Sequence, residues 1–346
     1  MKYHLLTTAA LCAVFSFGLS SCKKSSNLPA AAAAGDLETV QDMIEDGADV
    51  NAKEDKLGGT AVVEAATAGK TDVVKALIAA GADLTIKDKK GEVATIRAAR
   101  NGHTDTVKAL LAVGMDANAT AMNGAPALLP AAWNGHTETV KALLAGKAHA
   151  DAQDVNGNTA ITFAARQKHT ETVKALLEGG ASINSADVTG CTALIYAAGN
   201  GDTATVNALI EAGADLNLQE LNGRTALIMA AEKGHAEVVK SLMDAKADTT
   251  LKNKSGYNAL VVALMAGKKD MAQNMLQAGA TVTPAEVESF ISLLTARKYS
   301  GIAEQLKSIG VDLSAKGEDG KSALMIADEK GHKGAAEALK AAGAAE

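Results

Sequence analysis

Residues 190–222 read GCTALIYAAGNGDTATVNALIEAGADLNLQELN, and this segment decides the fold. Thr192 is placed as the N-cap of a short apolar helix over 193–198. Asp202 opens a second helix and complements its dipole. The second helix carries apolar residues at the i, i+3, i+4 spacing of a buried face, namely Val206, Leu209 and Ile210. Gly213 ends that helix in the left-handed conformation, and the polar stretch behind it predicts a short finger.

The same unit recurs along most of the chain. Glycine falls every 33 residues, at positions 58, 91, 124, 157, 190, 223 and 256. A strict period of this length indicates a stack of small units, each of which touches only its two neighbours. Such a stack does not gather distant residues into a compact active site.

The repeated residues resemble the ankyrin repeat, whose pattern runs G-x-T-P-L-x-x-A-A, then G-H, V-x-x-L-L and G-A-D-x-N. Here the pattern reads GRTAL at 223–227, AA at 230–231, GH at 234–235 and VV at 238–239. The family's proline is alanine in most copies, which is benign in a first helical turn. The resemblance implies an all-α ankyrin-repeat solenoid over residues 30–346, with about ten helix-turn-helix units and short β-turn fingers.

Two units depart from the pattern. In the fourth unit, Pro126 replaces the capping threonine, Pro130 falls inside the first helix, and Lys147 stands where a C-terminal glycine is expected. The ninth unit lacks its glycine, and Thr283-Pro284 is expected to begin a helix instead, because proline suits the first helical position. Local irregularity of this kind accompanies function in some proteins and is drift in others.

The N-terminus has the features of a targeting segment. Residues 1–21 have a basic start and an apolar stretch too short to span a bilayer. Leu19-Ser20-Ser21-Cys22 resembles the lipobox of bacterial lipoproteins, which implies a signal peptide over 1–21, lipidation of Cys22, and a short polar tether over 22–29. An ordinary secretory signal with a chance cysteine is the alternative. The lipoprotein interpretation predicts that the chain is a membrane-anchored lipoprotein of the cell envelope. Lys23 favours the outer membrane or a periplasm-facing position.

Little in the sequence supports catalysis. Histidines recur at one repeat position, but packed helices about 8–10 Å apart hold them too far from one another to share a metal ion. We therefore expect each histidine to hydrogen-bond the turn between helices, and we expect no metal, no cofactor and no enzymatic activity. Cys191 has no partner cysteine outside the leader and tether, so it is either an inert small residue or a thiol that pairs between molecules.

The charge balance narrows the class of partner. The formal net charge is −6, and lysine and arginine form no run, so a basic stripe for nucleic acid is lacking. The expected partner is a protein, with membrane contact through the lipid anchor only. We expect the chain to be a monomer.

Reading the chain in the repeat register locates a candidate binding face. The positions two before each glycine run from lysine to apolar residues and back to lysine, namely Lys56, Lys89, Met122, Val155, Val188, Leu221 and Lys254. Trp133, the one tryptophan, is flanked in the same register by Arg100 and Arg166. Arg224 and Tyr257 follow their repeat glycines in two later fingers. Tryptophan and arginine dominate interface hot spots. The alternative is that Trp133 fills a gap in its own repeat and that the apolar tips pack on each other.

These observations are compatible with three functions. The favoured one is a lipid-anchored protein–protein interaction scaffold of the bacterial cell envelope, which binds its partner on the concave face and fingers of the central repeats. The alternative, by family analogy, is an immunity or inhibitor protein that occludes a toxic envelope enzyme such as a phospholipase. A hydrolase or redox protein that uses Cys191 is the third.

Overall fold

A computed structural model describes residues 27–54, 56–296 and 302–345. The expected signal peptide, Cys22 and most of the expected tether lie outside the described residues. Helix α1 begins at Leu28, so the last two residues of the expected tether, 28 and 29, are helical.

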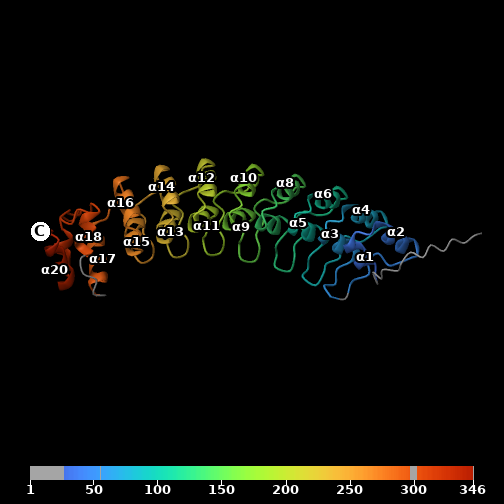
Figure 1. Cartoon of the computed structure of the whole chain (residues 1–346), viewed down its shortest axis with the longest axis horizontal. Helices are drawn as coiled ribbons and strands as arrows, with labels where there is room; N and C mark the ends of the chain where they lie inside the picture. Colours follow the sequence, from blue (N-terminus) through green and yellow to red (C-terminus); the bar gives the residue numbers. More distant parts are fainter. Residues whose placement is uncertain (1–26, 55, 297–301, 346) are drawn as a thin grey trace, which may run out of the picture.

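The described residues form ten helix pairs stacked in one gently arched row, which confirms the expected solenoid (Figure 1). The first helices of the pairs are α1 Leu28–Ala34, α3 Ala61–Thr67, α5 Ala94–Arg100, α7 Leu128–Trp133, α9 Ala160–Arg166, α11 Ala193–Asn200, α13 Ala226–Lys233, α15 Ala259–Met265, α17 Pro284–Ala296 and α19 Ala323–Glu329. The second helices are α2 Leu37–Glu45, α4 Thr71–Ala79, α6 Thr104–Ala112, α8 Thr137–Ala145, α10 Thr170–Glu178, α12 Thr203–Glu211, α14 Ala236–Asp244, α16 Lys269–Gln277, α18 Ile302–Ser308 and α20 Lys333–Ala341.

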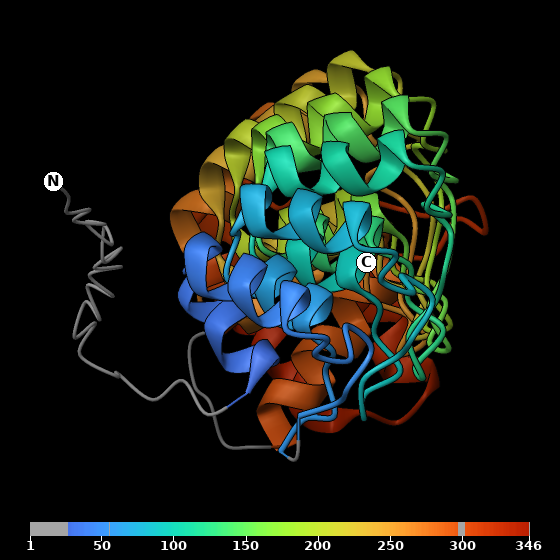
Figure 2. The same cartoon turned by 90° about the vertical axis from the view of Figure 1, so that its right-hand side faces the viewer.

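The first helices form the middle layer of the molecule. The second helices cover one side of them, and the fingers extend from the other side, where they lie together in the view along the stack (Figure 2). In α11 the residues Ala193, Leu194, Ile195, Ala197 and Ala198 are all buried. Alanine is abundant here because small side chains let neighbouring helices approach closely. No helix in the described ranges is long and apolar enough to cross a membrane.

Local capping explains where the helices begin and end. Thr192 Oγ1 accepts a hydrogen bond from Ile195 N at 3.3 Å, as its position predicts. Asp202 caps α12 in the same way, through Thr205 N. Gly213 ends α12 with a φ of 84°. Lys147 takes the same left-handed conformation, and Lys246 does so three repeats later, so this irregularity is not confined to the fourth unit.

Histidines join consecutive repeats. In four of them Nε2 donates to a backbone carbonyl near the end of the preceding first helix, at 3.1 Å from the oxygen, in the pairs His103–Thr67, His136–Arg100, His169–Trp133 and His235–Gly199. The expected bond to a turn between helices is therefore made to the preceding repeat, at the residue where its first helix leads into the turn. The rings lie close over the turn glycines of the preceding repeats, where a side chain would collide with them.

Threonines make a second connection between repeats. The hydroxyl at the start of one second helix lies 2.7–2.8 Å from a hydroxyl in the first turn of the next, in the pairs Thr71–Thr106, Thr104–Thr139, Thr137–Thr172 and Thr170–Thr205. The series ends at α14, where Val238 occupies the register of Thr205. These bonds link five consecutive second helices, from α4 to α12.

The fingers are joined by a third set of bonds, from backbone to backbone. The N–H two residues before a repeat glycine donates to the carbonyl one residue before the previous glycine. The donor–acceptor pairs are Lys89–Leu57, Met122–Lys90, Val155–Asn123, Val188–Asn156, Leu221–Thr189 and Lys254–Asn222, at 2.8–3.3 Å. The fingers therefore form one hydrogen-bonded comb, and their tips are held in fixed positions.

The C-terminal repeats close the stack. Thr283 and Glu286 form a reciprocal cap at the start of α17, in which Thr283 N donates to Glu286 Oε2 at 2.7 Å, so a helix begins where the sequence predicts it. Glu288 of α17 is buried, forms an ion pair with Lys330 and is hydrogen-bonded to His332, both of the last repeat. This buried carboxylate ties the long helix of the ninth pair to the tenth.

The finger comb predicts different costs for two glycine substitutions. Gly213 and Gly223 both have a positive φ, so alanine at either site should cost about 1 kcal/mol of unfolding free energy. Only Gly223 lies against the next finger, where a new Cβ would be 3.0 Å from Lys254 N and 3.1 Å from the Asn253 Cα. We expect Gly223→Ala to lose roughly a further 1 kcal/mol or more. Urea unfolding followed by circular dichroism measures both, and equal losses would contradict the close approach.

Candidate protein-binding surface

The apolar residues at the finger tips are exposed. Met122, Val155, Val188 and Leu221, which we call the finger row, are 78%, 70%, 65% and 58% accessible. The tips therefore do not bury one another, and that alternative is wrong. Lys89 and Lys254 extend from the fingers on either side of the row. Leu57 is a further exposed apolar residue. It lies one residue before its repeat glycine, whereas the finger row lies two residues before, so it falls outside the register of the row.

Trp133 is part of a cluster that spans three repeats. It ends helix α7 with 37% of its surface exposed and meets Phe163 of α9 edge to face, with ring centroids 5.0 Å apart. The Arg166 guanidinium lies over both the Trp133 ring, at 5.8 Å, and the Tyr196 ring, at 5.4 Å. We call these four residues the aromatic–arginine cluster. Trp133 thus packs against the next repeat and keeps an exposed surface as well.

Sequence reasoning identified Trp133 and Arg166 but missed Phe163 and Tyr196. These two share a register, six residues after their repeat glycines, which differs from the registers of the finger row and of Trp133. The signal was available, since Arg97, Pro130 and Met229 occupy the same register and the aromatic residues stand out among them. The cluster forms through contacts between residues of different registers in neighbouring repeats.

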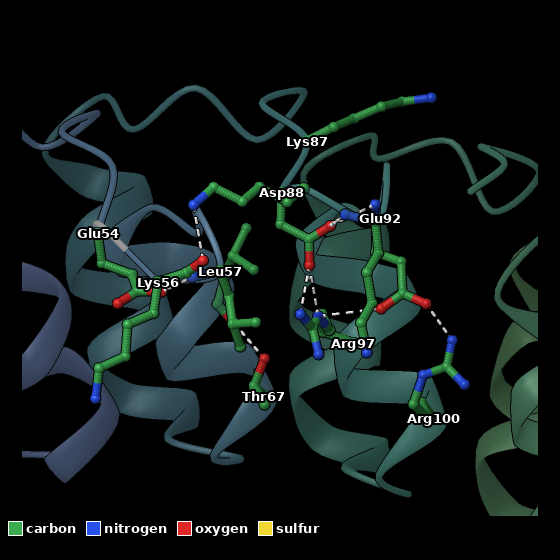
Figure 3. A network of polar contacts seen from close by, with 12 residues as sticks. Glu54, Lys56, Leu57, Thr67, Lys87, Asp88, Glu92, Arg97 and Arg100 are labelled. Atoms are coloured by element: carbon green, nitrogen blue, oxygen red, sulfur yellow. Dashed lines mark hydrogen bonds and ion pairs between the residues drawn. The ribbon is translucent and has the colours of Figure 1, made fainter. Parts of the chain in front are cut away.

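Arg100 lies one repeat before Trp133 and belongs to a separate polar network (Figure 3). Buried Arg97 donates from Nε to Asp88 at 2.8 Å and lies 3.1 Å from Glu92. Arg100 forms an ion pair with the other oxygen of Glu92. Burial raises the pKa of Asp88, but hydrogen bonds from Glu92 N and Arg97 outweigh it, so the pKa lies below its usual value. Glu92 therefore neutralises the positive charge of Arg100 within the chain.

Arg224 and Tyr257 lie at the far end of the surface, beside a hollow of about 530 Å³. Arg224 pairs with Glu220 at 3.1 Å and with Glu232 at 3.2 Å. The other residues that line the hollow include Asn222, Lys254, Val262 and Met265. The hollow joins two repeats on the side of the fingers and first helices.

Tyr196 also holds the base of its finger. Its hydroxyl donates to Asp187, which accepts from Thr189 Oγ1 at 2.6 Å and from Cys191 N at 3.1 Å. Burial raises the pKa of Asp187, but the bonds from Thr189 and Tyr196 hold it below its usual range. Burial and the bond to Asp187 raise the pKa of Tyr196. The phenol is therefore neutral and acts as a donor.

The described residues offer little reactive chemistry. Cys191 is a half-buried free thiol, and burial raises its pKa, which disfavours the nucleophilic thiolate. In the described ranges, histidine, cysteine and acidic residues form no group of three or more that could hold a metal ion. The sequence-predicted residues instead lie on one side of the stack, along the fingers and first helices.

Comparison with known families agrees with this architecture. A family model described as Ankyrin repeats (3 copies) matches residues 28–121, 128–220 and 196–285. No curated protein matches the chain.

The Tyr196–Asp187 bond predicts a pH-dependent loss in Tyr196→Phe. Because the folded-state pKa of Asp187 is lowered, its stabilisation is present above the unfolded value of about 4 and is lost as pH falls through the folded-state pKa. Tyr196→Phe should therefore cost about 1.5–3 kcal/mol at neutral pH, and the cost should fall in acid to the roughly 0.5–1.5 kcal/mol of a hydrogen bond between neutral groups. Urea unfolding across this range measures it.

Tyr257→Phe is the matched control for that experiment. Its hydroxyl has no hydrogen-bond partner among the described residues, so the substitution should change stability little at any pH. A loss in Tyr196→Phe that is the same at neutral and acid pH would contradict the role given to Asp187.

Proposed function

Because the chain belongs to the ankyrin-repeat family, we propose that it is a lipid-anchored scaffold of the bacterial cell envelope that binds a protein partner across the finger row and the aromatic–arginine cluster. Proteins of this family are generally non-catalytic interaction scaffolds. The observation that carries the proposal is the finger row, in which four adjacent tips expose apolar side chains on a hydrogen-bonded backbone. Exposed apolar rows of this kind mark interaction sites.

The energetics of the surface favour a protein ligand. Fully burying one valine, leucine or methionine side chain contributes about 1.5–3 kcal/mol, so the partly exposed row offers several kcal/mol to a partner. The comb fixes the backbone of the tips before binding, which lowers the ordering cost of association. Trp133 adds an aromatic anchor whose edge-to-face contact with Phe163 holds its ring in place.

The proposed anchor rests on the N-terminal sequence. Cys22 follows the lipobox-like residues, and α1 begins at Leu28. Six residue steps span at most about 22 Å when fully extended, so a lipid on Cys22 would keep the first repeat near the membrane surface. Lys23, rather than an aspartate, follows the cysteine and favours the outer membrane.

The binding face is tested by the double variant Trp133→Ala/Val155→Asp. It removes the aromatic anchor and places a charge in the finger row, so we expect capture of the partner from envelope extracts to be lost. Pull-down with quantitative mass spectrometry measures capture, and circular dichroism should show unchanged helix content.

The matched control for this variant is Val113→Asp. Val113 follows α6 on the side of the second helices and is 51% exposed, so the same substitution is made on the opposite side of the stack. Capture should be unchanged in this variant. Equal capture by the double variant and the wild type would show that the binding face lies elsewhere.

The anchor is tested by Cys22→Ser. We expect this variant to lose incorporation of labelled palmitate and to move from the membrane fraction to the soluble fraction of the envelope. The matched control is Cys191→Ser, which should keep both the label and the membrane association. Membrane association that survives Cys22→Ser would contradict lipid anchoring.

A further inference from the structure

We infer that Arg166 is a preorganised receptor for a carboxylate, and that the partner presents an aspartate or glutamate side chain next to apolar residues. This inference rests on the proposed binding face and names the chemistry of its central contact. It follows from the difference between Arg166 and the other arginines of the described residues.

Arg166 is the only one of these arginines that lacks a carboxylate partner within the described part of the chain. Arg97 pairs with Asp88 and Glu92, Arg100 with Glu92, and Arg224 with Glu220 and Glu232. The comparison with Arg100 is direct, because Arg100 and Arg166 share one repeat register. The register that holds Glu92 in the third repeat holds Asn158 in the fifth, so the internal counter-charge is missing there.

The surroundings of Arg166 fix its position without using its donors. Arg166 is an exposed residue, and its guanidinium lies over two aromatic rings, at 5.8 Å from Trp133 and 5.4 Å from Tyr196. A ring face attracts the positive charge, whereas the N–H groups lie in the guanidinium plane and bind planar carboxylates as a fork. The rings therefore restrict the side chain, and its N–H groups remain available to a ligand.

The nearby acids are already engaged. Asp154 accepts hydrogen bonds from Asn156 N and Asn158 N, both at 2.9 Å. Asp187 is buried and accepts from Tyr196 and Thr189. The guanidinium of Arg166 thus has no carboxylate partner among the described residues, and the finger tips of its own repeat and of the next, Val155 and Val188, are apolar and exposed. A ligand that matches both features carries one acid flanked by apolar side chains.

This arrangement favours an acidic protein segment over a polyanion. Nucleic acid is held by several cations that neutralise successive phosphates. The finger row presents apolar residues where such cations would be needed, and the chain as a whole is acidic.

Selection of displayed random twelve-residue peptides on the purified full chain tests the inference. We expect peptides enriched on the wild type to contain aspartate or glutamate beside apolar residues. Selection on Arg166→Gln should keep the apolar residues and lose the acid, whereas Arg100→Gln, whose charge is already paired, should keep both. An enrichment without acids, an acid preference that survives Arg166→Gln, or an empty selection overturns the inference.

A selected peptide then gives a quantitative test through the fluorescence of Trp133, the chain's single tryptophan. Replacing the peptide glutamate by glutamine should weaken binding to the wild type by about tenfold, as expected for a charge-assisted bond. The same replacement should change binding to Arg166→Gln by less than about twofold. Equal effects on the two chains would assign the acid to another contact and overturn the proposal.

Two further arms separate this inference from the proposed function. Peptides that lose binding on Val155→Asp but show no acid preference would leave the binding face intact and overturn only the carboxylate site. Peptides unaffected by both Val155→Asp and Trp133→Ala would refute the face itself. Arg166-dependent binding of a twelve-nucleotide oligothymidine that is tighter than any selected peptide would assign the site to nucleic acid and overturn the inference.

Discussion

Contact with the next repeat is the constraint on which the rest of this structure depends. A pair of helices of six to nine residues, such as α7 and α8, is too short to be stable alone in water. The first helices are buried only because neighbouring repeats cover them. The same neighbours supply hydrogen bonds: histidine rings donate to backbone carbonyls of the preceding repeat, and threonine hydroxyls pair with threonine hydroxyls of the next. Stability is therefore shared along the stack.

This sharing divides the positions of a repeat into two groups. Residues that hold the stack are nearly the same in each unit, because each must fit an equivalent neighbour. Side chains at the finger tips and at the ends of the first helices change from one unit to the next, even where, as with Trp133 and Arg166, they contact a neighbouring repeat. Met122, Trp133 and Arg166 belong to this second group. The residues at the varying positions can therefore determine which partner is bound without disturbing the residues that hold the stack.

The fold could be predicted almost completely from the sequence, because the glycine period gives the length of the repeat unit and the capping residues mark where its helices begin and end. The finger row could also be predicted, since exposure there depends on a single register. The state of each arginine could not. Arg100 and Arg166 share a register, and only the side-chain contacts show that Arg100 pairs with Glu92, whereas Arg166 lies over the Trp133 and Tyr196 rings with no carboxylate partner among the described residues. Contacts between different registers of neighbouring repeats depend on side-chain packing, and the repeat period alone does not predict that packing.

The spacing of the fingers has a consequence for the shape of what lies on them. Packed helices are about 8–10 Å apart, and each finger of the comb advances by one such step. A chain in the polyproline II conformation rises about 3.1 Å per residue with three residues per turn, so it repeats every 9 Å or so on one face. Successive finger tips are thus nearly commensurate with every third residue of such a chain. A β-strand, which alternates its faces every residue, would turn every second contact away.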